Sequence, residues 1–278
     1  MTSEALHGRI LKNQKEDTVQ TDENPYKTPE SYDALQTPSS STLYPPRTVG
    51  AGRGISWLGE GYTLYRKSPL AWLGLTIIWL VLMGMSWMIP LANNLVQPLL
   101  LAGIATACLR LDTAHHFSME DLFVGFKQQT GSLVLVGAIS VSASLVIIIA
   151  AFLMGLSSVL SMAEMSKEAI AGGAAEGAIL TLLTLLLVAV TIMTPLAMAM
   201  WFSPLLIIFH KVPALEAMKL SFNACLYNMI PFLFYALAAI PLLILAAIPA
   251  FLGYLILIPV LFASIYTSYK DIFLREGS

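Results

Sequence analysis

The residues best suited to bind a metal ion are two adjacent histidines with acidic neighbours. His115 and His116 lie close in sequence to Asp112, Glu120 and Asp121. Imidazole nitrogens and carboxylate oxygens are common ligands of zinc. Adjacent histidines on a helix point in different directions, however, so they rarely bind one ion together. We therefore favour a solvated loop over a metal site, and we expect no cofactor.

Hydroxyl groups are the next candidates, because the long apolar runs contain no charged side chain near their centres. Ion-coupled transport usually requires ionisable residues inside the membrane, so a proton-coupled carrier is disfavoured. Serine and threonine in membrane helices most often join helices or satisfy backbone groups freed by proline. The alternative is a polar binding cavity formed by such span residues, Ser140 among them and in particular Thr106, Ser203 and Thr267.

Signatures of catalysis and of nucleic-acid binding are missing from the sequence. It has no Gly-x-Ser-x-Gly nucleophile elbow and no basic patch. Its two cysteines, Cys108 and Cys225, lie in or beside apolar segments, without the number or spacing of a disulfide framework. We predict that the protein is not an enzyme and binds no nucleic acid.

The composition predicts a membrane protein. Of the 278 residues, 57% are hydrophobic and 12% are charged, whereas soluble domains are about 25% charged. The first 50 residues contain no apolar core of a signal peptide. The first strongly apolar run begins at Leu70 and is too long for a signal, so we expect it to act as an uncleaved anchor.

Residues 1–53 are polar and rich in proline, which predicts a disordered tail before a membrane domain at 54–278. The alternative is a docking or phosphorylation segment at Thr28-Pro29 and Thr37-Pro38. A protein partner could bind this tail or the interfacial helices. Deletion of residues 1–48 is expected to leave stability nearly unchanged.

Charge-free runs predict six spans in an all-α integral membrane protein. At 1.5 Å per residue, about 20 residues cross a hydrocarbon core of about 30 Å. The first run extends from Leu70 to Pro90, and Asn93, Asn94 and Gln97 mark its far side. The other spans lie in residues 95–109, 128–163, 177–209 and 220–269, the last of which has room for two.

The distribution of basic residues predicts the orientation. Lysine and arginine are retained on the cytoplasmic side of a membrane. With both termini cytoplasmic, Lys167 is the only one of the 15 basic residues that faces out. The runs on either side of Lys167 exceed one perpendicular span, so these helices are expected to tilt, kink or project.

A sequence pattern recurs after three prolines, Pro98, Pro195 and Pro259, where we expect helix kinks. The fourth residue after each proline is alanine and the eighth carries a hydroxyl: Ala102, Ala199 and Ala263, then Thr106, Ser203 and Thr267. The pattern predicts three units of interfacial helix, span and proline-bearing span, at about 55–112, 118–210 and 213–273. Units of two spans share one orientation, so a pseudo-threefold axis along the membrane normal is expected.

Each interfacial helix carries a small residue followed by an aromatic one: Gly61-Tyr62, Gly125-Phe126 and Ser221-Phe222. Gly61 precedes Pro98 by 37 residues and Ser221 precedes Pro259 by 38, whereas Gly125 precedes Pro195 by 70. The small residues are expected to face a neighbouring span at a helix corner, because they permit close backbone approach. The aromatic residues, together with Trp57, are expected at the headgroup level.

The stretches PLLLAGIATACLRL, SMEDLFVGF and PVLFASIYTSYKDIF resemble a family of bacterial multi-pass inner-membrane proteins of unknown function. The chain is also distantly similar to the membrane domain fused to some glycerophosphodiester phosphodiesterases. The resemblance covers about residues 52–273. It implies six helices in a bacterial inner membrane and supplies no catalytic residues.

Two functions remain open at this point. The first is a membrane interaction or homeostasis protein that contacts lipids and cytoplasmic or membrane partners. The second is a permease or lipid-handling protein with a cavity among the proline-kinked helices. A cavity lined by polar groups would distinguish the second from the first.

Overall fold

The computed structural model describes residue 43 and residues 45–164 and 167–274, with side chains described outside 157–178. The predicted disorder of residues 1–42 and the outer loop around Gly172 therefore lie outside the described residues or side chains. The chain divides into two units, residues 1–38 and 39–278, and every described residue belongs to the second unit.

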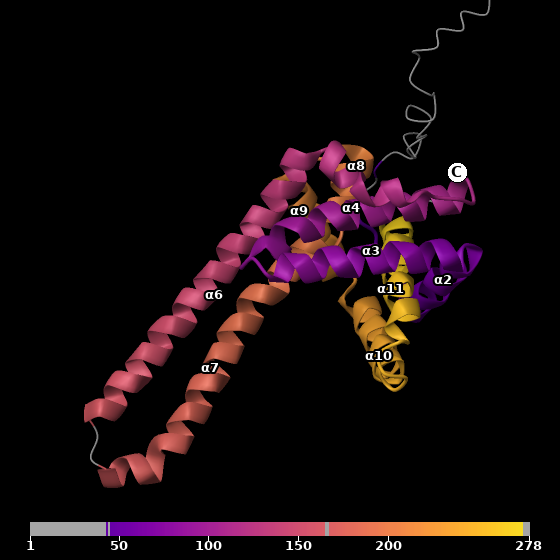
Figure 1. Ribbon diagram of the computed structural model, residues 1–278. Coiled ribbons are helices and arrows are strands. Elements are labelled where there is room, and N and C mark those ends of the chain that lie inside the picture. The colour runs from indigo at the N-terminus through magenta and orange to yellow at the C-terminus, as the bar shows by residue number, and fades with distance from the viewer. Residues whose placement is uncertain (1–42, 44, 165–166, 275–278) are drawn as a thin grey trace, which may run out of the picture. The chain divides into compact units, whose positions relative to one another are not determined.

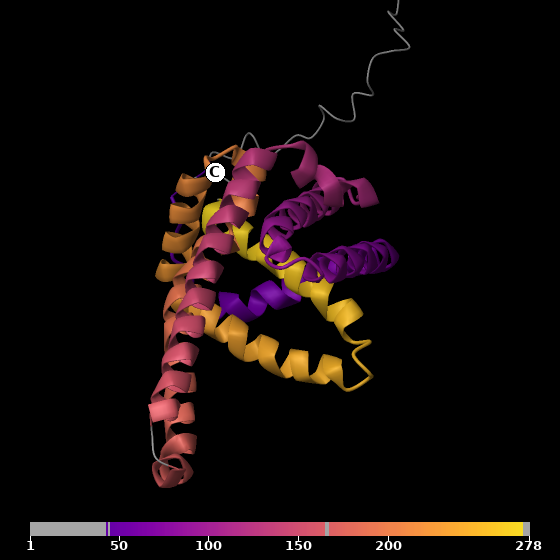
Figure 2. The same cartoon turned by 60° about the vertical axis from the view of Figure 1, so that its left-hand side comes forward.

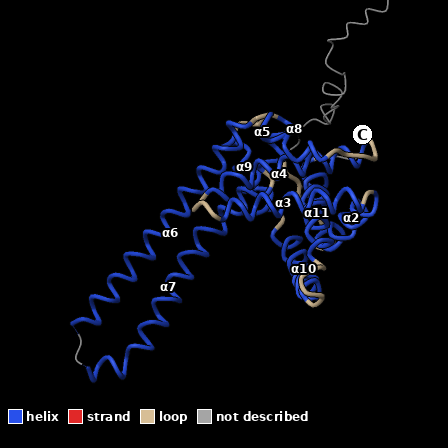
Figure 3. Tube along the Cα trace, viewed as in Figure 1, coloured by secondary structure: helices blue, strands red, loops and turns tan. Residues whose placement is uncertain are grey.

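The described part of the chain is helical and contains no strand (Figures 1 and 3). Six helices are long and apolar enough to span a membrane, as predicted. They are α3 (Pro69–Trp87), α4 (Ala92–Thr113), α6 (Thr130–Glu164), α7 (Lys167–Trp201), α10 (Met229–Ala247) and α11 (Tyr254–Phe273). Within this set α3 pairs with α4, α6 with α7 and α10 with α11 as consecutive helices along the chain.

Shorter helices join these pairs. They are α2 (Arg53–Lys67), the 3-10 helix η1 (Met119–Phe123) with α5 (Val124–Lys127), α8 (Ser203–His210) and α9 (Ala214–Tyr227). Pro69 occupies the first turn of α3, where a proline costs no intrahelical hydrogen bond. The same rule explains the break between α7 and α8, because Pro204 lies in the first turn of α8.

The three repeat prolines lie inside helices rather than at helix ends. Pro98 is within α4, Pro195 within α7 and Pro259 within α11. The interruption in the second unit follows Trp201, beyond Pro195, so Pro204 rather than Pro195 ends α7.

The helices α6 and α7 run beside each other and extend beyond the other helices (Figures 1 and 2). Each has 35 residues. At 1.5 Å per residue, that length is about 52 Å, more than a hydrocarbon core of about 30 Å. The extra length falls between Gly125 and Pro195, where the predicted second unit is longer in sequence than the other two predicted units.

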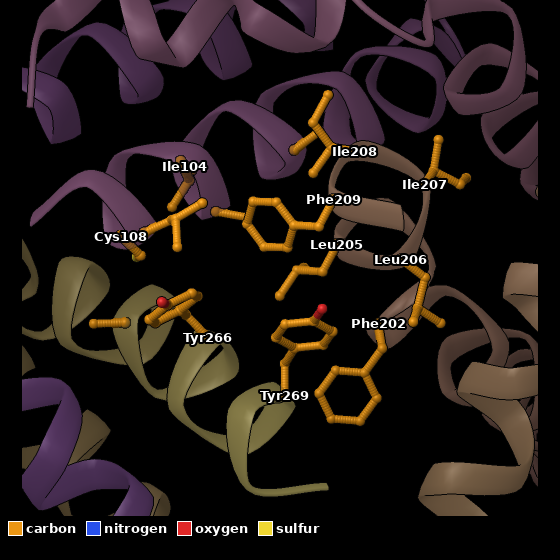
Figure 4. Packing of buried hydrophobic residues seen from close by; sticks show 14 of the residues in the cluster. Ile104, Cys108, Phe202, Leu205, Leu206, Ile207, Ile208, Phe209, Tyr266 and Tyr269 are labelled. Carbon is orange, nitrogen blue, oxygen red and sulfur yellow. The ribbon is translucent and has the colours of Figure 1, made fainter. Parts of the chain in front are cut away.

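The core lies where α4, α8 and α11 meet (Figure 4). Cys108, Leu205 and Tyr269 are each the tenth residue after a repeat proline, and each is at most 1% exposed. The ring of Phe209 lies 5.7 Å from that of Tyr269, between centroids. Aromatic rings at such distances add specific contact energy to the area that they bury.

A segment before the predicted start of the membrane domain packs on it. The Arg47 backbone N–H donates to the Ile272 carbonyl at 3.1 Å. Asn228, which is fully buried, accepts from the Val49 N–H at 2.9 Å and donates to the Arg47 carbonyl at 2.9 Å. The packed structure therefore begins before residue 54, and a deletion to residue 48 removes contacts with the last helix.

Candidate functional site

The predicted histidine cluster is divided among separate contacts. His115 and His116 are exposed, and Asp121 is 2% exposed and forms an ion pair with Arg110 at 3.0 Å. Burial raises the pKa of Asp121 above its usual value, although the Ser118 backbone N–H and Arg110 act in the opposite direction. Within the described residues, no three potential ligands come together.

Asp112 instead joins the ends of three helices. Its carboxylate lies 2.6 Å from the Lys270 ammonium of α11 and 3.6 Å from that of Lys67 in α2. The Tyr266 hydroxyl donates to the same carboxylate at 3.3 Å. These contacts fix the charged ends of α2, α4 and α11 to one another.

A second charged cluster surrounds Asp271 near the end of α11. Arg53 and Arg47 form ion pairs with it at 2.6 and 2.9 Å, and the Trp57 indole N–H donates to it at 3.0 Å. The hydrogen bond to Asp271 raises the pKa of Arg53 above its usual value. Trp57 is 0% exposed and lies 5.3 Å from Phe232 between ring centroids, so its side chain packs within the protein, and its level relative to the headgroups stays a prediction. It packs inward because its helix lies directly on α10 and α11.

The three repeat hydroxyls donate to backbone carbonyls. The Thr106 hydroxyl donates to the Ala102 carbonyl at 3.0 Å, and the Ser203 hydroxyl donates to the Met200 carbonyl at 3.4 Å. Both acceptors lie within four residues of the donor in sequence. Thr267 donates to the Trp57 carbonyl of α2 at 3.2 Å. None of the three hydroxyls lines either of the two cavities that adjoin α7. Thr267 lines a third, charged pocket of about 180 Å³ together with Arg53 and Asp271.

Gly61 and Gly125 lie where an interfacial segment crosses a proline-bearing span. A Cβ atom on Gly61 would lie 2.6 Å from the Val260 carbonyl oxygen in α11. A Cβ atom on Gly125 would lie 2.2 Å from the Leu99 carbonyl oxygen in α4. Both contacts are with backbone atoms, so any side chain would force the helices apart.

Ser221 occupies the corresponding place in the third unit. It is fully buried, and its hydroxyl donates to the Met198 carbonyl at 2.7 Å. The same oxygen accepts from the Phe202 backbone N–H at 2.9 Å. In α9, a small polar side chain therefore bonds the backbone at the end of α7.

Each of these crossings joins a short helix to a proline-bearing one. At Gly61 α2 meets α11, at Gly125 α5 meets α4, and at Ser221 α9 meets α7. The residue contacted lies shortly after the repeat proline in each case: Val260, Leu99 and Met198.

Two adjoining cavities lie on the same part of α7. The central cavity, of about 330 Å³, is bounded by residues of α3, α4, α6, α7, α8 and α11. The lateral groove, of about 730 Å³, is bounded by α7, α9 and α10. Met193, Ala197 and Trp201 line both, so one molecule could occupy the two together.

The two cavities differ in chemistry. The central cavity is lined by the polar residues Gln97 and Ser140 and by two tryptophans, Trp79 and Trp201. The lateral groove is lined almost wholly by apolar side chains, with Thr194 and Cys225 as its polar members. None of the described residues that line either cavity carries a charge.

Trp201 has an unusual environment at the boundary of the two cavities. Its indole N–H is buried and has no hydrogen-bond partner within the part of the chain that the structure describes. Its ring packs edge-on against Phe232 at 5.8 Å between centroids. A buried N–H without an acceptor costs about 1–3 kcal/mol.

Comparison with known proteins agrees with this architecture. The chain is 27% identical over 199 residues to a probable inner membrane protein of Burkholderia thailandensis, covering 68% of this chain and 73% of the relative. Together with the six apolar helices, this supports a bacterial multi-pass inner-membrane protein. No protein-family model matches the chain. No solved structure matches it.

Sequence reasoning does not find the residues that line the central cavity. By sequence, Gln97 only marks the far side of the first span, Ser140 is one of several span hydroxyls considered for a polar cavity, and Trp201 is an ordinary span residue. One available signal is Gln97 itself, a carboxamide directly before the repeat proline Pro98 and at the start of a buried helix. The unpaired N–H of Trp201 has no signature in sequence.

Proposed function

We propose that this protein binds a membrane amphiphile in the central cavity and lateral groove. The observation that carries the proposal is the wall that these cavities share at Met193, Ala197 and Trp201. One cavity presents polar groups and the other presents an apolar surface, the same division that an amphiphile has. Of the two functions left open by the sequence, this geometry favours lipid handling.

The lateral groove is accessible from the surface that faces the bilayer. Val190, Met229, Ile230 and Leu233 line it and are each at least 52% exposed. Lipid tails are as apolar as these side chains, so removal from water supplies no driving force inside a membrane. Selective binding must therefore come from close packing in the groove and from polar contacts in the central cavity.

We also infer that the spans form three units about a pseudo-threefold axis. The cyclic order of the crossings at Gly61, Gly125 and Ser221 supports this arrangement. The basic residues support cytoplasmic termini, since Lys167 alone would face out. On this account the protein carries out no catalysis. Its cytoplasmic tail is a candidate segment for binding a protein partner. Its similarity to the phosphodiesterase membrane domain remains a hypothesis.

The test is native mass spectrometry of the protein released from lipid nanodiscs. Ala197 is exposed and lines both cavities, so Ala197→Trp should fill their junction. Leu237→Trp is the matched control, because Leu237 is 56% exposed on α10 and lines neither cavity.

We expect the unchanged protein and Leu237→Trp to retain a bound amphiphile that Ala197→Trp loses, at similar melting temperatures. Equal retention by all three proteins would contradict the proposal. Ala197→Leu provides a smaller obstruction if the tryptophan variant is unstable, and it should reduce the retained fraction.

A further inference from the structure

The described walls of the central cavity and the lateral groove carry no charge, unlike the small pocket lined by Arg53, Lys270 and Asp271. The ionisable groups that the structure describes form clusters at helix ends, around Asp112 and Asp271, and none lines the central cavity or the lateral groove. An ionised group buried without a partner in a medium of low dielectric is strongly disfavoured. A phosphate, carboxylate or ammonium headgroup would therefore be unpaired in the central cavity.

The polar groups of the central cavity match an uncharged oxygen. The Trp201 indole can only donate a hydrogen bond, and it has no acceptor among the described residues. Ser140 is 7% exposed and its hydroxyl can donate or accept, as can the Gln97 carboxamide. The Trp201 N–H is enclosed by protein atoms, so a carbonyl oxygen in the cavity would accept from it only after the ring turns toward the cavity. Ser140 and Gln97 offer further donors within the same wall.

Flat apolar surfaces surround these polar groups. Trp79 and Phe262 line the cavity with their rings edge to face, 5.1 Å apart between centroids. Pro98 and Pro204 contribute to the same lining. Such a wall suits a compact headgroup with carbonyl oxygens and contains no feature that would compensate a charge.

We propose that the amphiphile has an uncharged, carbonyl-bearing headgroup in the central cavity and a long apolar tail in the lateral groove. This inference rests on the proposed function and names the class of ligand for the same site. Two membrane components share this chemistry, an isoprenoid quinone and a diacylglycerol. Anionic phospholipids are excluded from the central cavity on this account.

The experiment titrates the full-length protein in nanodiscs with three probes: a short-chain isoprenoid quinone, dioctanoylglycerol and dioctanoyl phosphatidylglycerol. Bound probe is measured by native mass spectrometry. We expect the quinone, the diacylglycerol or both to bind at least about tenfold more tightly than phosphatidylglycerol, since the charged headgroup finds no partner. Binding of only one uncharged probe identifies which of the two sources the site accepts.

Two variants test the role of the polar wall. Trp201→Phe keeps an aromatic ring against Phe232 and removes the N–H donor, and Ser140→Ala removes the hydroxyl. Each should weaken binding of the uncharged probe by about fivefold, as expected for one lost hydrogen bond. Ser142→Ala is the control, because Ser142 is exposed on the same helix, donates to Ala138 and does not line the cavity.

The possible results separate this inference from the proposed function. If phosphatidylglycerol binds as tightly as the uncharged probes and Ala197→Trp abolishes that binding, the proposed function stands and this inference is overturned. If an uncharged probe binds but both Trp201→Phe and Ser140→Ala leave its affinity unchanged, the inference is also overturned. If no probe binds and no amphiphile is retained, the proposed function fails with it.

Discussion

Replacing Gly61 with alanine should disrupt the crossing of α2 and α11. The added Cβ atom would lie 2.6 Å from the Val260 carbonyl oxygen and 2.9 Å from the Ser264 nitrogen. Ordinary contact begins near 3.4 Å, so the two backbones would have to separate by about 0.8 Å (3.4 − 2.6 Å). Backbone atoms within helices cannot rotate away as a flexible side chain would.

The magnitude follows from two opposing contributions. Overpacking of this kind costs about 1–3 kcal/mol, whereas replacing a glycine inside a helix with alanine gains about 1 kcal/mol. Gly59 lies in the same helix with nothing within 4 Å of its Cβ position, so Gly59→Ala has only the gain. The difference in unfolding free energy between the two variants should therefore be about 1–3 kcal/mol, independent of helix propensity.

The assay is thermal unfolding in detergent, followed by the intrinsic fluorescence of tryptophan. Trp57 lies on the same helix and is fully buried, so its emission should report on the crossing. For a domain of this size, each kcal/mol corresponds to about 2–4 °C in melting temperature. Gly61→Ala should melt below Gly59→Ala by about 2–12 °C. Equal melting temperatures would refute the close approach of α2 and α11.

Three further results are expected. Ser221→Ala should lower the unfolding free energy by about 1–3 kcal/mol, because the Phe202 N–H loses its buried acceptor. Ser142 is exposed, so the control Ser142→Ala should change the unfolding free energy by less than about 0.5 kcal/mol. Burial raises the pKa of the Cys225 thiol to about 12, so the reactive thiolate forms only far above neutral pH. Maleimide at pH 8 should therefore label Cys225 only after the protein unfolds. Rapid labelling of Cys225 in the folded protein would contradict its packing. Deletion of residues 1–48 should lower the melting temperature relative to deletion of 1–42, since it removes the Arg47 contacts with Asp271, and identical values would show that these contacts add no stability.

The spans were predictable from the sequence because their determinant is local. A charge-free run of about 20 residues is read directly from the chain, and the apolar part of each of the six helices lies within such a run. Small residues at Gly61, Gly125 and Ser221 are likewise visible without a structure, and the assignment of these residues to equivalent helix corners stays a prediction. Whether the crossings make the repeat a true threefold remains a prediction.

Contacts between distant parts of the chain were not predictable. The segment at Arg47 looks like tail by composition, and only the carboxamide of Asn228 and the carboxylate of Asp271, far along the chain, hold it. Trp57 has the composition of an interfacial anchor and is buried because α10 and α11 cover it. The central cavity depends on which faces of six helices meet, and periodicity within one helix does not specify its neighbours.

The most direct test of amphiphile binding is photo-crosslinking with an uncharged lipid that carries a photoreactive group in its chain. After illumination in nanodiscs, peptide mapping should place saturable crosslinks on residues 193–201 of α7 and 229–233 of α10, around the shared wall at Met193, Ala197 and Trp201. An unlabelled competitor and Ala197→Trp should remove these crosslinks, and Leu237→Trp should leave them in place. Crosslinks spread evenly over exposed positions such as Leu182, Leu186 and Leu237, and unaffected by competitor, would contradict a specific site.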